Sequence, residues 1–274
     1  MSLAQRSSRL PYICGFNSFC MQIEQKKSGS YAYLDEGQGR TLVLLHGLLG
    51  GLSNFEEVLT YFSKNGYRVI MPVMPMYSLP LVKTNIKNLA KFLDGFLAHM
   101  ELENITLIGN SLGGHVSLVY TKNYPDRIHS LCLTGSSGLY ESAMGDSFPR
   151  RGDYEYIKTK TEEVFYRKEV ATKELVDEVF ESVNDRNKIL RTLSFSKSAI
   201  RHNMAEDLKE FHLPVCLIWG ENDLVTPPHV ANRFKELLPD SELHWVEECG
   251  HAAMMERPDE FNRLLHDFLK RRVG

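Results

Sequence analysis

Ile105-Thr106-Leu107-Ile108-Gly109-Asn110-Ser111-Leu112-Gly113-Gly114 is the stretch of this 274-residue chain that decides its fold. Its first four residues predict a buried strand, and the segment from Leu112 to Asn123 predicts a helix directly after it. The pattern G-x-S-x-G therefore falls on a strand-to-helix turn, where it marks a nucleophilic serine. As a bare string the pattern is weak evidence, because glycine and serine are both common. The strand and the helix around it supply the specificity.

The turn has physical reasons for its residues. A sharp elbow holds a serine in a strained conformation, with its hydroxyl lifted clear of the backbone. Cβ atoms at positions 109 and 113 would collide across that turn, so glycine is expected at both. The helix that begins after Ser111 points its unpaired N–H groups towards an oxygen that becomes an anion during acyl transfer. Ser111 is therefore predicted to be a nucleophile rather than an ordinary turn serine.

Outward from this stretch, short apolar runs alternate with helical patterns along most of the chain. Such a βαβ series predicts an α/β fold with a doubly wound, mostly parallel sheet. Polar residues 26–29 predict the turn of a β-hairpin, between strands 16–25 and 30–36, before the series begins. The predicted strands of the series cover 42–45, 67–71, 105–108, 128–133, 215–219 and 242–246, and the predicted helices lie near 54–64, 84–100, 112–123, 229–238 and 258–271.

The alternation stops between Leu139 and Leu213, where charged and helix-forming residues occur without a comparable apolar strand. The segment is too rich in Phe and Tyr to be disordered. It is best interpreted as an inserted helical cap. The predicted organisation is thus a first part of the core over 1–138, the cap over 139–213 and a second part of the core over 214–274.

The composition, with 43% hydrophobic and 24% charged residues, is that of an ordinary globular protein. A formal net charge of −3 makes neither nucleic acid nor an anionic membrane an expected partner, which favours a small-molecule substrate and leaves a homodimer open. The chain lacks an apolar run of about 18 residues and a secretory signal, so we expect a cytoplasmic protein. Its five cysteines show no metal-type spacing and are expected to be reduced, with no metal and no cofactor.

With a serine elbow inside a βαβ series, the chain resembles the α/β-hydrolase family. More narrowly, it is similar to the cap-bearing carboxylesterases and carbon–carbon bond hydrolases, and the resemblance extends from Phe16 onward. The similar epoxide hydrolases and haloalkane dehalogenases carry an aspartate at the elbow, so Ser111 argues against those two chemistries.

The family's chain order of serine, acid and histidine implies the rest of a catalytic triad. Serine alone is a poor nucleophile at neutral pH, so an imidazole must accept its proton and a carboxylate must orient that imidazole. By resemblance, Asp223 after the first strand beyond the cap is the acid, and His251 after the last strand is the base. Glu221 is the local competitor for the acid, and His115 is interpreted as a packed core histidine.

The run His46-Gly47-Leu48-Leu49-Gly50-Gly51 follows the first parallel strand and is similar to the family's His-Gly oxyanion loop. The resemblance implies that the backbone N–H groups of Leu48 and Leu112 form the oxyanion hole. A glycine-rich loop of this kind also occurs in phosphate sites. The run has neither a P-loop lysine nor the G-x-G-x-x-G spacing, so nucleotide binding is not expected.

Three features depart from the family or bear on its substrate. Residues 71–80 are apolar and proline-rich where many relatives carry Asp-x-x-Gly-x-Gly-x-Ser, and they either line the pocket or pack under the cap. Ala252 stands where carbon–carbon hydrolases commonly have a tryptophan next to the catalytic histidine. In the cap, Arg150 and Arg151 either bind an acidic substrate or are solvated.

The expected function is a serine hydrolase that opens a small or medium carboxylic ester through an acyl-serine intermediate. Carbon–carbon bond hydrolysis is the enzymatic alternative, and a ligand receptor built on the same fold is the alternative from another class. An apolar substrate wall is expected from Leu48, Leu49, Met74 and Met76 on the core side.

Overall fold

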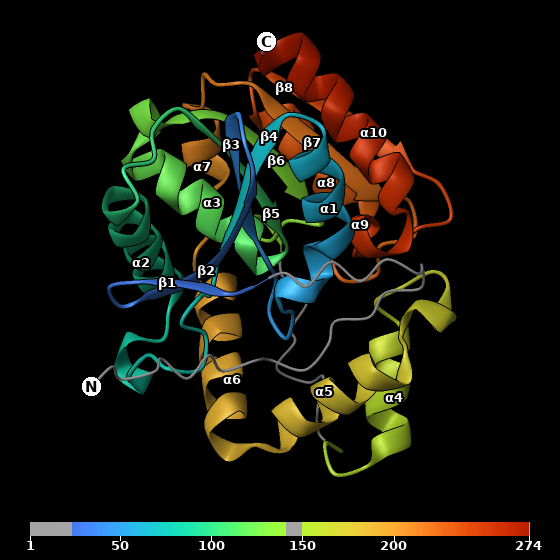
Figure 1. Cartoon of the computed structure of the whole chain (residues 1–274). Helices are drawn as coiled ribbons and strands as arrows, with labels where there is room; N and C mark the ends of the chain where they lie inside the picture. The colour runs from blue at the N-terminus through green and yellow to red at the C-terminus, as the bar shows by residue number, and fades with distance from the viewer. Residues whose placement is uncertain (1–23, 141–149, 274) are drawn as a thin grey trace, which may run out of the picture.

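The computed structural model describes residues 24–140 and 150–273, and its centre is an eight-stranded sheet in the order β1-β2-β4-β3-β5-β6-β7-β8 (Figure 1). β1 and β2 pair antiparallel at one edge, and every pairing from β4 to β8 is parallel. This is the doubly wound sheet that the sequence predicts. The strands are β1 (Lys26–Ser28), β2 (Tyr31–Gly37), β3 (Arg40–Leu45), β4 (Tyr67–Pro72), β5 (Ile105–Asn110), β6 (Ile128–Thr134), β7 (Val215–Gly220) and β8 (Ser241–Val246).

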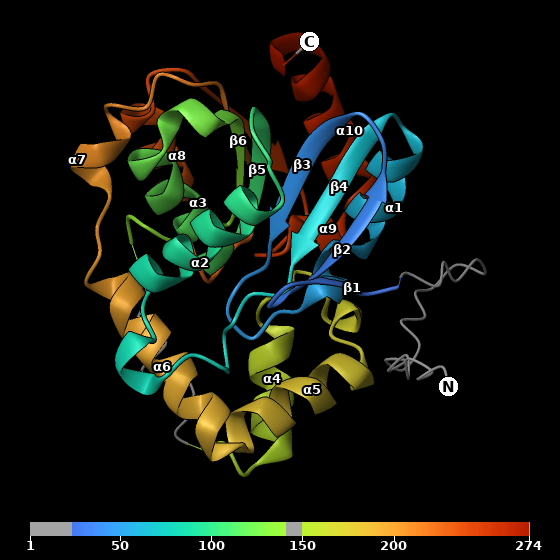
Figure 2. The ribbon, with the colours of Figure 1, turned by 60° about the vertical axis from the view of Figure 1, so that its left-hand side comes forward.

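Helices cover both faces of the sheet (Figures 1 and 2). One face packs against α2 (Ile86–His99), α3 (Leu112–Asn123) and α8 (Pro228–Leu237). The other packs against α1 (Glu56–Lys64), α9 (Ala253–Glu256) and α10 (Pro258–Phe268). Within the part of the chain that the structure describes, no helix is both long and apolar enough to cross a bilayer.

The residues of β7 explain why both faces are covered. Successive side chains of a strand point to opposite faces. Val215, Leu217 and Trp219 pack with the helices of the α2 face, whereas Cys216 and Ile218 pack with those of the α1 face. A strand without a polar face is stable only when helices shield it on both sides.

Between β6 and β7 the chain leaves the sheet and forms α4 (Tyr154–Glu162), α5 (Lys173–Asn184), α6 (Arg186–Ile200) and α7 (Ala205–Leu208). α4, α5 and α6 form a separate layer below the sheet in Figures 1 and 2. Side chains of Asp153, Thr172 and Asp185 accept N–H bonds at the starts of α4, α5 and α6, so each helix has its own N-cap. The layer is the inserted helical cap that the sequence predicts, and its limits at 139 and 213 stay a prediction.

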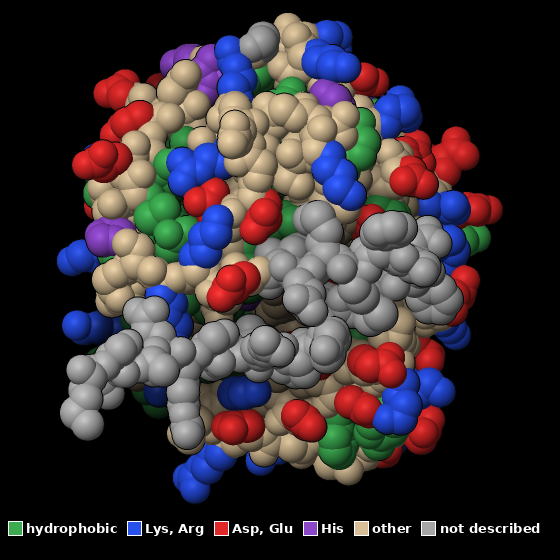
Figure 3. Space-filling model, viewed as in Figure 1, with side chains coloured by type: hydrophobic (Ala, Val, Ile, Leu, Met, Phe, Trp, Pro, Cys, Tyr) green, Lys and Arg blue, Asp and Glu red, His purple; other side chains and the backbone are tan. Residues whose placement is uncertain are grey.

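The outer surface of this layer is charged but mixed. Acidic and basic side chains lie side by side over it in Figure 3. Helix-spaced ion pairs such as Lys158–Glu162 and Lys173–Asp177 account for part of this mixture. Pairs of this kind each stabilise a helix by only about 0.3–0.5 kcal/mol, so the packing inside the layer matters more.

The hairpin before the parallel series differs from its prediction. Lys26–Ser28 forms β1 instead of the turn, and the chain reverses at residues 29–30. Gly29 has φ +57°, and a two-residue hairpin turn needs such a left-handed residue at its first position. The prediction therefore placed the turn too early. Most of the first predicted strand, 16–25, lies outside the described residues.

Candidate active site

Ser111 lies at the elbow between β5 and α3 with φ 54° and ψ −119°, a strained conformation for a residue with a side chain. A Cβ on Gly109 would come within 2.5 Å of the backbone of Gly114, which is the collision expected across the turn. A Cβ on Gly113 would instead come within 2.1 Å of the carbonyl oxygen of Leu45. The second glycine therefore lets α3 pack directly on the end of β3, a reason that the motif does not reveal.

His251 and Asp223 form a buried pair with 2.9 Å between Nδ1 and Oδ2. The other carboxylate oxygen accepts the backbone N–H groups of Val225 and Thr226, at 2.8 Å each, and the Thr226 hydroxyl donates to Oδ2. Because a carboxylate only accepts, Nδ1 of His251 carries the proton and Nε2 is left with its lone pair. Glu221 is exposed.

A pocket of about 260 Å³, which Asp223 does not line, lies between Ser111, His251 and the helical layer. Ser111 and His251 line its inner wall, together with residues of the loop after β3. Side chains of α4, α5 and the segment after α4 line the opposite wall. The residues that line it are Gly47, Leu48, Leu49, Gly50, Asn54, Asn110, Ser111, Lys160, Thr161, Glu163, Val164, Phe165, Leu175, Val179, Leu224, Val225, His251, Ala252 and Met255.

The loop after β3 lies directly against the elbow, since a Cβ on Gly47 would be 3.0 Å from Cβ of Ser111. Strand order reverses at this point, with β4 on one side of β3 and β5 on the other, and α/β folds bind ligands at such switch points. Neither the Leu48 nor the Leu112 N–H donates to a backbone carbonyl in a turn or loop of the described chain. Leu48 lines the pocket and Leu112 directly follows Ser111, and their role as an oxyanion hole stays a prediction.

Two expectations about the pocket walls have different outcomes. Leu48 and Leu49 line the pocket as predicted, but Met74 and Met76 are buried in the apolar core on the α2 face and do not line it. That part of the prediction is wrong and the alternative of packing under the cap holds, because both side chains share an apolar cluster with residues of α6. Arg150 and Arg151, the candidate anion binders of the insertion, are exposed and do not line the pocket either.

Asn110 is a site residue that the sequence analysis missed. Its side-chain amide donates to the carbonyl oxygens of Thr134, at 3.0 Å, and of His251, at 3.2 Å. One side chain therefore ties the end of β6 and the histidine loop to the elbow. The motif G-x-S-x-G leaves this position open, so only the three-dimensional structure reveals the role.

Replacing Asn110 by alanine should lower kcat by about ten- to a hundredfold and change KM little, because a small displacement of reacting groups has an effect of that order. Asn110→Asp should be at least as impaired, since its carboxylate would face two carbonyl oxygens. Steady-state kinetics together with circular dichroism measures this. Asn65, whose amide donates to the exposed carbonyl of Tyr61, provides the control variant Asn65→Ala. A wild-type kcat for Asn110→Ala would show that the amide positions nothing.

A buried carboxylate, Glu256, connects the histidine loop to the inserted layer. It accepts the N–H of Gly250 at 2.7 Å and the backbone N–H groups of residues 166–167. The N–H of His251 donates to the carbonyl oxygen of Val164 at 2.8 Å. The segment after α4 and the loop that carries the histidine are therefore one hydrogen-bonded unit.

His115 is fully buried in α3, and its Nε2 lies 3.1 Å from Nδ1 of His202. Burial, helped by repulsion from His202, lowers the pKa of His115 to about 3. The imidazole therefore stays neutral at physiological pH and does not line the pocket. This placement agrees with its interpretation as a packed core histidine.

The lowered pKa of His115 predicts acid sensitivity. Above the ordinary pKa of 6.5, neither the folded nor the unfolded chain protonates His115, so this group does not lower the free energy of unfolding. As the pH falls from 6.5 towards 3, only the unfolded chain takes up this proton, and the folded state loses stability. Each pH unit in that window lowers the free energy of unfolding by about 1.4 kcal/mol. Between pH 7 and pH 5, the free energy of unfolding measured in urea should fall by about 2 kcal/mol less in His115→Gln than in the wild type. Equal losses would contradict the prediction, and His129→Gln, at a half-buried position, is the control.

Comparison with known proteins identifies the family to which this fold and pocket belong. The family model for the alpha/beta hydrolase fold matches residues 40–258. The chain therefore belongs to the alpha/beta hydrolase family, and it is an enzyme of that hydrolase class.

Named relatives are similar over most of their length. A 2-hydroxy-6-oxononadienedioate/2-hydroxy-6-oxononatrienedioate hydrolase of Paraburkholderia phymatum is 31% identical over 86% of this chain and 90% of its own. A 2-hydroxy-6-oxo-6-phenylhexa-2,4-dienoate hydrolase of Comamonas testosteroni is 28% identical over 88% and 91%. The crystal structure of MGS-MChE2, an alpha/beta hydrolase enzyme from the metagenome of lagoon sediments at Mar Chica, Morocco, is 46% identical with a TM-score of 0.76, covering 92% of this chain and 100% of that one.

Proposed function

We propose that this chain hydrolyses a carbon–carbon bond in a 2-hydroxy-6-oxo-dienoate-type acid, with Ser111 as nucleophile, His251 as base and Asp223 as the group that orients His251. The names of the relatives at 28–31% identity support this reaction over the ester hydrolysis that the sequence analysis ranked first. The pocket supports it through its composition. It offers apolar walls for a carbon chain and a lysine, Lys160, on the wall opposite Ser111.

The proposed first step is attack on a carbonyl carbon. Nε2 of His251 accepts the hydroxyl proton of Ser111 while the oxygen bonds to the 6-oxo carbon of the substrate. The protonated imidazole is stabilised by the carboxylate of Asp223, 2.9 Å from Nδ1. Negative charge develops on the substrate oxygen, and the N–H groups of Leu48 and Leu112 are assigned to bind it.

Water balances the reaction. The substrate reacts as its 2-oxo tautomer, in which the 2-hydroxyl proton has moved to the carbon next to the 6-oxo carbon. When the bond between these two carbons breaks, its electron pair is delocalised as the dienolate of the 2-oxo acid, and the enolate oxygen takes the proton from His251. Water then releases the acyl group from Ser111 as a carboxylic acid, so one water is consumed and no redox step is needed.

Lys160 is assigned to the substrate carboxylate. Among the described residues that line the pocket it is the only lysine or arginine, and it pairs at 2.5 Å with Glu163, three residues later at the end of α4. An acid that enters can replace Glu163 as its partner. Lys160→Gln should therefore raise KM for an acidic substrate and leave KM for a neutral ester nearly unchanged. Lys158→Gln is the matched control, because Lys158 lies on the same helix outside the pocket.

Ester hydrolysis is the second candidate, and Ala252 favours it. This small residue lines the pocket where carbon–carbon hydrolases commonly carry a tryptophan. Under this candidate, residues 139–213 act as a cap that limits acyl length. Each buried CH₂ contributes about 0.8 kcal/mol until the pocket is full, so efficiency should rise over the first few acyl carbons and then fall.

The deciding experiment measures kcat/KM for 2-hydroxy-6-oxo-6-phenylhexa-2,4-dienoate and for nitrophenyl esters of graded acyl length with the same preparation. Loss of the absorbance of the conjugated dienoate reports carbon–carbon cleavage, and benzoate is the expected product. We expect the dienoate to be preferred by at least about a hundredfold, which corresponds to about 2.7 kcal/mol of transition-state stabilisation. Preference for an ester with no turnover of the dienoate would establish the second candidate instead.

A further inference from the structure

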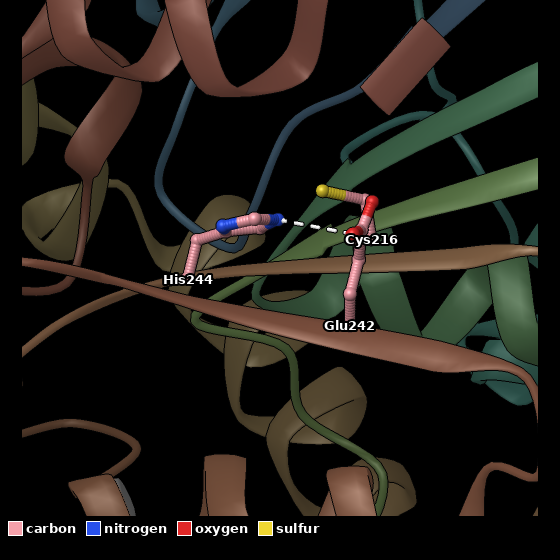
Figure 4. A group of neighbouring side chains, drawn as sticks. All are labelled: Cys216, Glu242 and His244. Carbon is pink, nitrogen blue, oxygen red and sulfur yellow. Dashed lines mark ion pairs between the residues drawn. The ribbon is translucent and has the colours of Figure 1, made fainter. Parts of the chain in front are cut away.

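Three metal-ligating side chains meet on the α1 face of the sheet, away from the pocket. Cys216 of β7 is in register with Glu242 of β8, and His244 follows two residues later on the same face of β8. Their ligand atoms all lie within 4.8 Å of one another. Figure 4 shows the thiol, the carboxylate and the imidazole gathered on one side of the two strands.

We propose that Cys216, Glu242 and His244 form a binding site for a zinc-like divalent cation. Zinc takes sulfur, nitrogen and oxygen ligands at about 2.0–2.3 Å, so the ligand atoms of a tetrahedral centre lie about 3.3–3.8 Å apart. Nε2 of His244 and Oε2 of Glu242 are 3.7 Å apart, too far for a hydrogen bond and suitable for two ligands of one ion. Three protein ligands leave the fourth position to water.

The state of His244 supports the site. Its Nε2 is buried, makes no well-formed hydrogen bond within residues 24–140 and 150–273, and interacts with the thiol of Cys216. A thiol is only a weak hydrogen-bond donor, so a metal ion would satisfy this nitrogen better. The side chains of His244 and Glu242 are 25% and 22% exposed to solvent. An ion can therefore reach the buried thiol from solvent along these two side chains.

Arg271 competes with an ion for the carboxylate. Its guanidinium donates to both oxygens of Glu242, at 3.1 and 3.0 Å. The arginine side chain is 54% exposed, so it can move into solvent when a cation binds. On binding, a sulfur–metal bond forms and the thiol proton of Cys216 goes to solvent.

The site would link the two strands that carry the proposed acid and base. Asp223 follows Cys216 by seven residues and His251 follows His244 by seven. An ion held by both strands stabilises the folded chain in proportion to its affinity, because the unfolded chain does not present the three ligands together. This inference does not depend on which bond the enzyme cleaves, and it differs from the expectation of no metal that the cysteine spacing gave.

The test uses the full chain, reduced and metal-free, titrated with Zn²⁺ against a chromophoric chelator and with Co²⁺ by absorption spectroscopy. We expect one ion per chain, a thiolate-to-cobalt charge-transfer band and a higher Tm with Zn²⁺. Cys216→Ser should abolish the band and weaken binding on the order of a hundredfold. Cys132→Ser is the matched control, since that buried thiol contacts Cys216 from β6 but is not one of the three ligands.

Two further variants keep the outcome clear if Cys216→Ser is unstable. His244→Gln, at a partly exposed position, should weaken Zn²⁺ binding by at least about tenfold. Arg271→Gln should strengthen binding, because it removes the competing cation. Zinc binding that survives both Cys216→Ser and His244→Gln, or that Cys132→Ser reduces equally, would overturn the assignment and place the ion on other thiols of the chain.

Discussion

Ser111→Ala should lower kcat for the preferred substrate at least about a thousandfold, since the members of a triad act as a unit and the remaining rate comes from binding and the oxyanion hole. Ser111 has the strained elbow conformation, and both Ser111 and His251 line the pocket. Chemical labelling gives a second readout. An organophosphonate should modify the wild type once, at Ser111, as located by mass spectrometry of its peptides.

Ser137 is the control for this experiment. It is buried, and its hydroxyl donates to the carbonyl oxygen of Ser111 at 3.3 Å, so it shares the surroundings of the nucleophile. Ser137→Ala should retain most of the activity and the label. Label on another serine, with Ser111 unmodified, would refute the assignment.

The second large effect concerns the carboxylate behind the imidazole. Asp223→Asn should reduce kcat on the order of ten-thousandfold, because an amide can donate to Nδ1 of His251 and so stabilise the wrong tautomer. Glu221→Gln should cost little, since Glu221 is exposed. Kinetics of the two variants side by side separate the two carboxylates. Comparable losses, or the reverse ranking, would contradict the role of Asp223.

The elbow was predictable because its signals are local. An apolar strand, glycines that the turn requires and a helix from residue 112 to 123 are consecutive in the sequence, and α3 spans those residues. Asp223 and His251 were placed by chain order within a resemblance. Their mutual distance of 2.9 Å depends on how β7 and β8 pair, which no local pattern specifies.

The supporting residues were not predictable for the same reason. Asn110 acts through a carbonyl 141 residues away in the chain, and Glu256 through the backbone of a segment about 90 residues earlier. Cys216 and His244 look unrelated in the sequence and become neighbours only through the parallel register of two strands. Contacts between distant segments depend on tertiary packing, and periodicity and motifs carry no information on them.

The hydrogen bonds of Glu256 have a consequence for exchanging caps between related enzymes. Residues 164–167 belong to the insertion by position, yet they are bonded to the loop of His251. A graft that replaced the whole of 139–213 would remove the acceptor of the His251 N–H and leave a buried carboxylate short of donors. A cap that can be exchanged therefore begins after Arg167, and residues 164–167 should come from the same enzyme as the loop that carries His251.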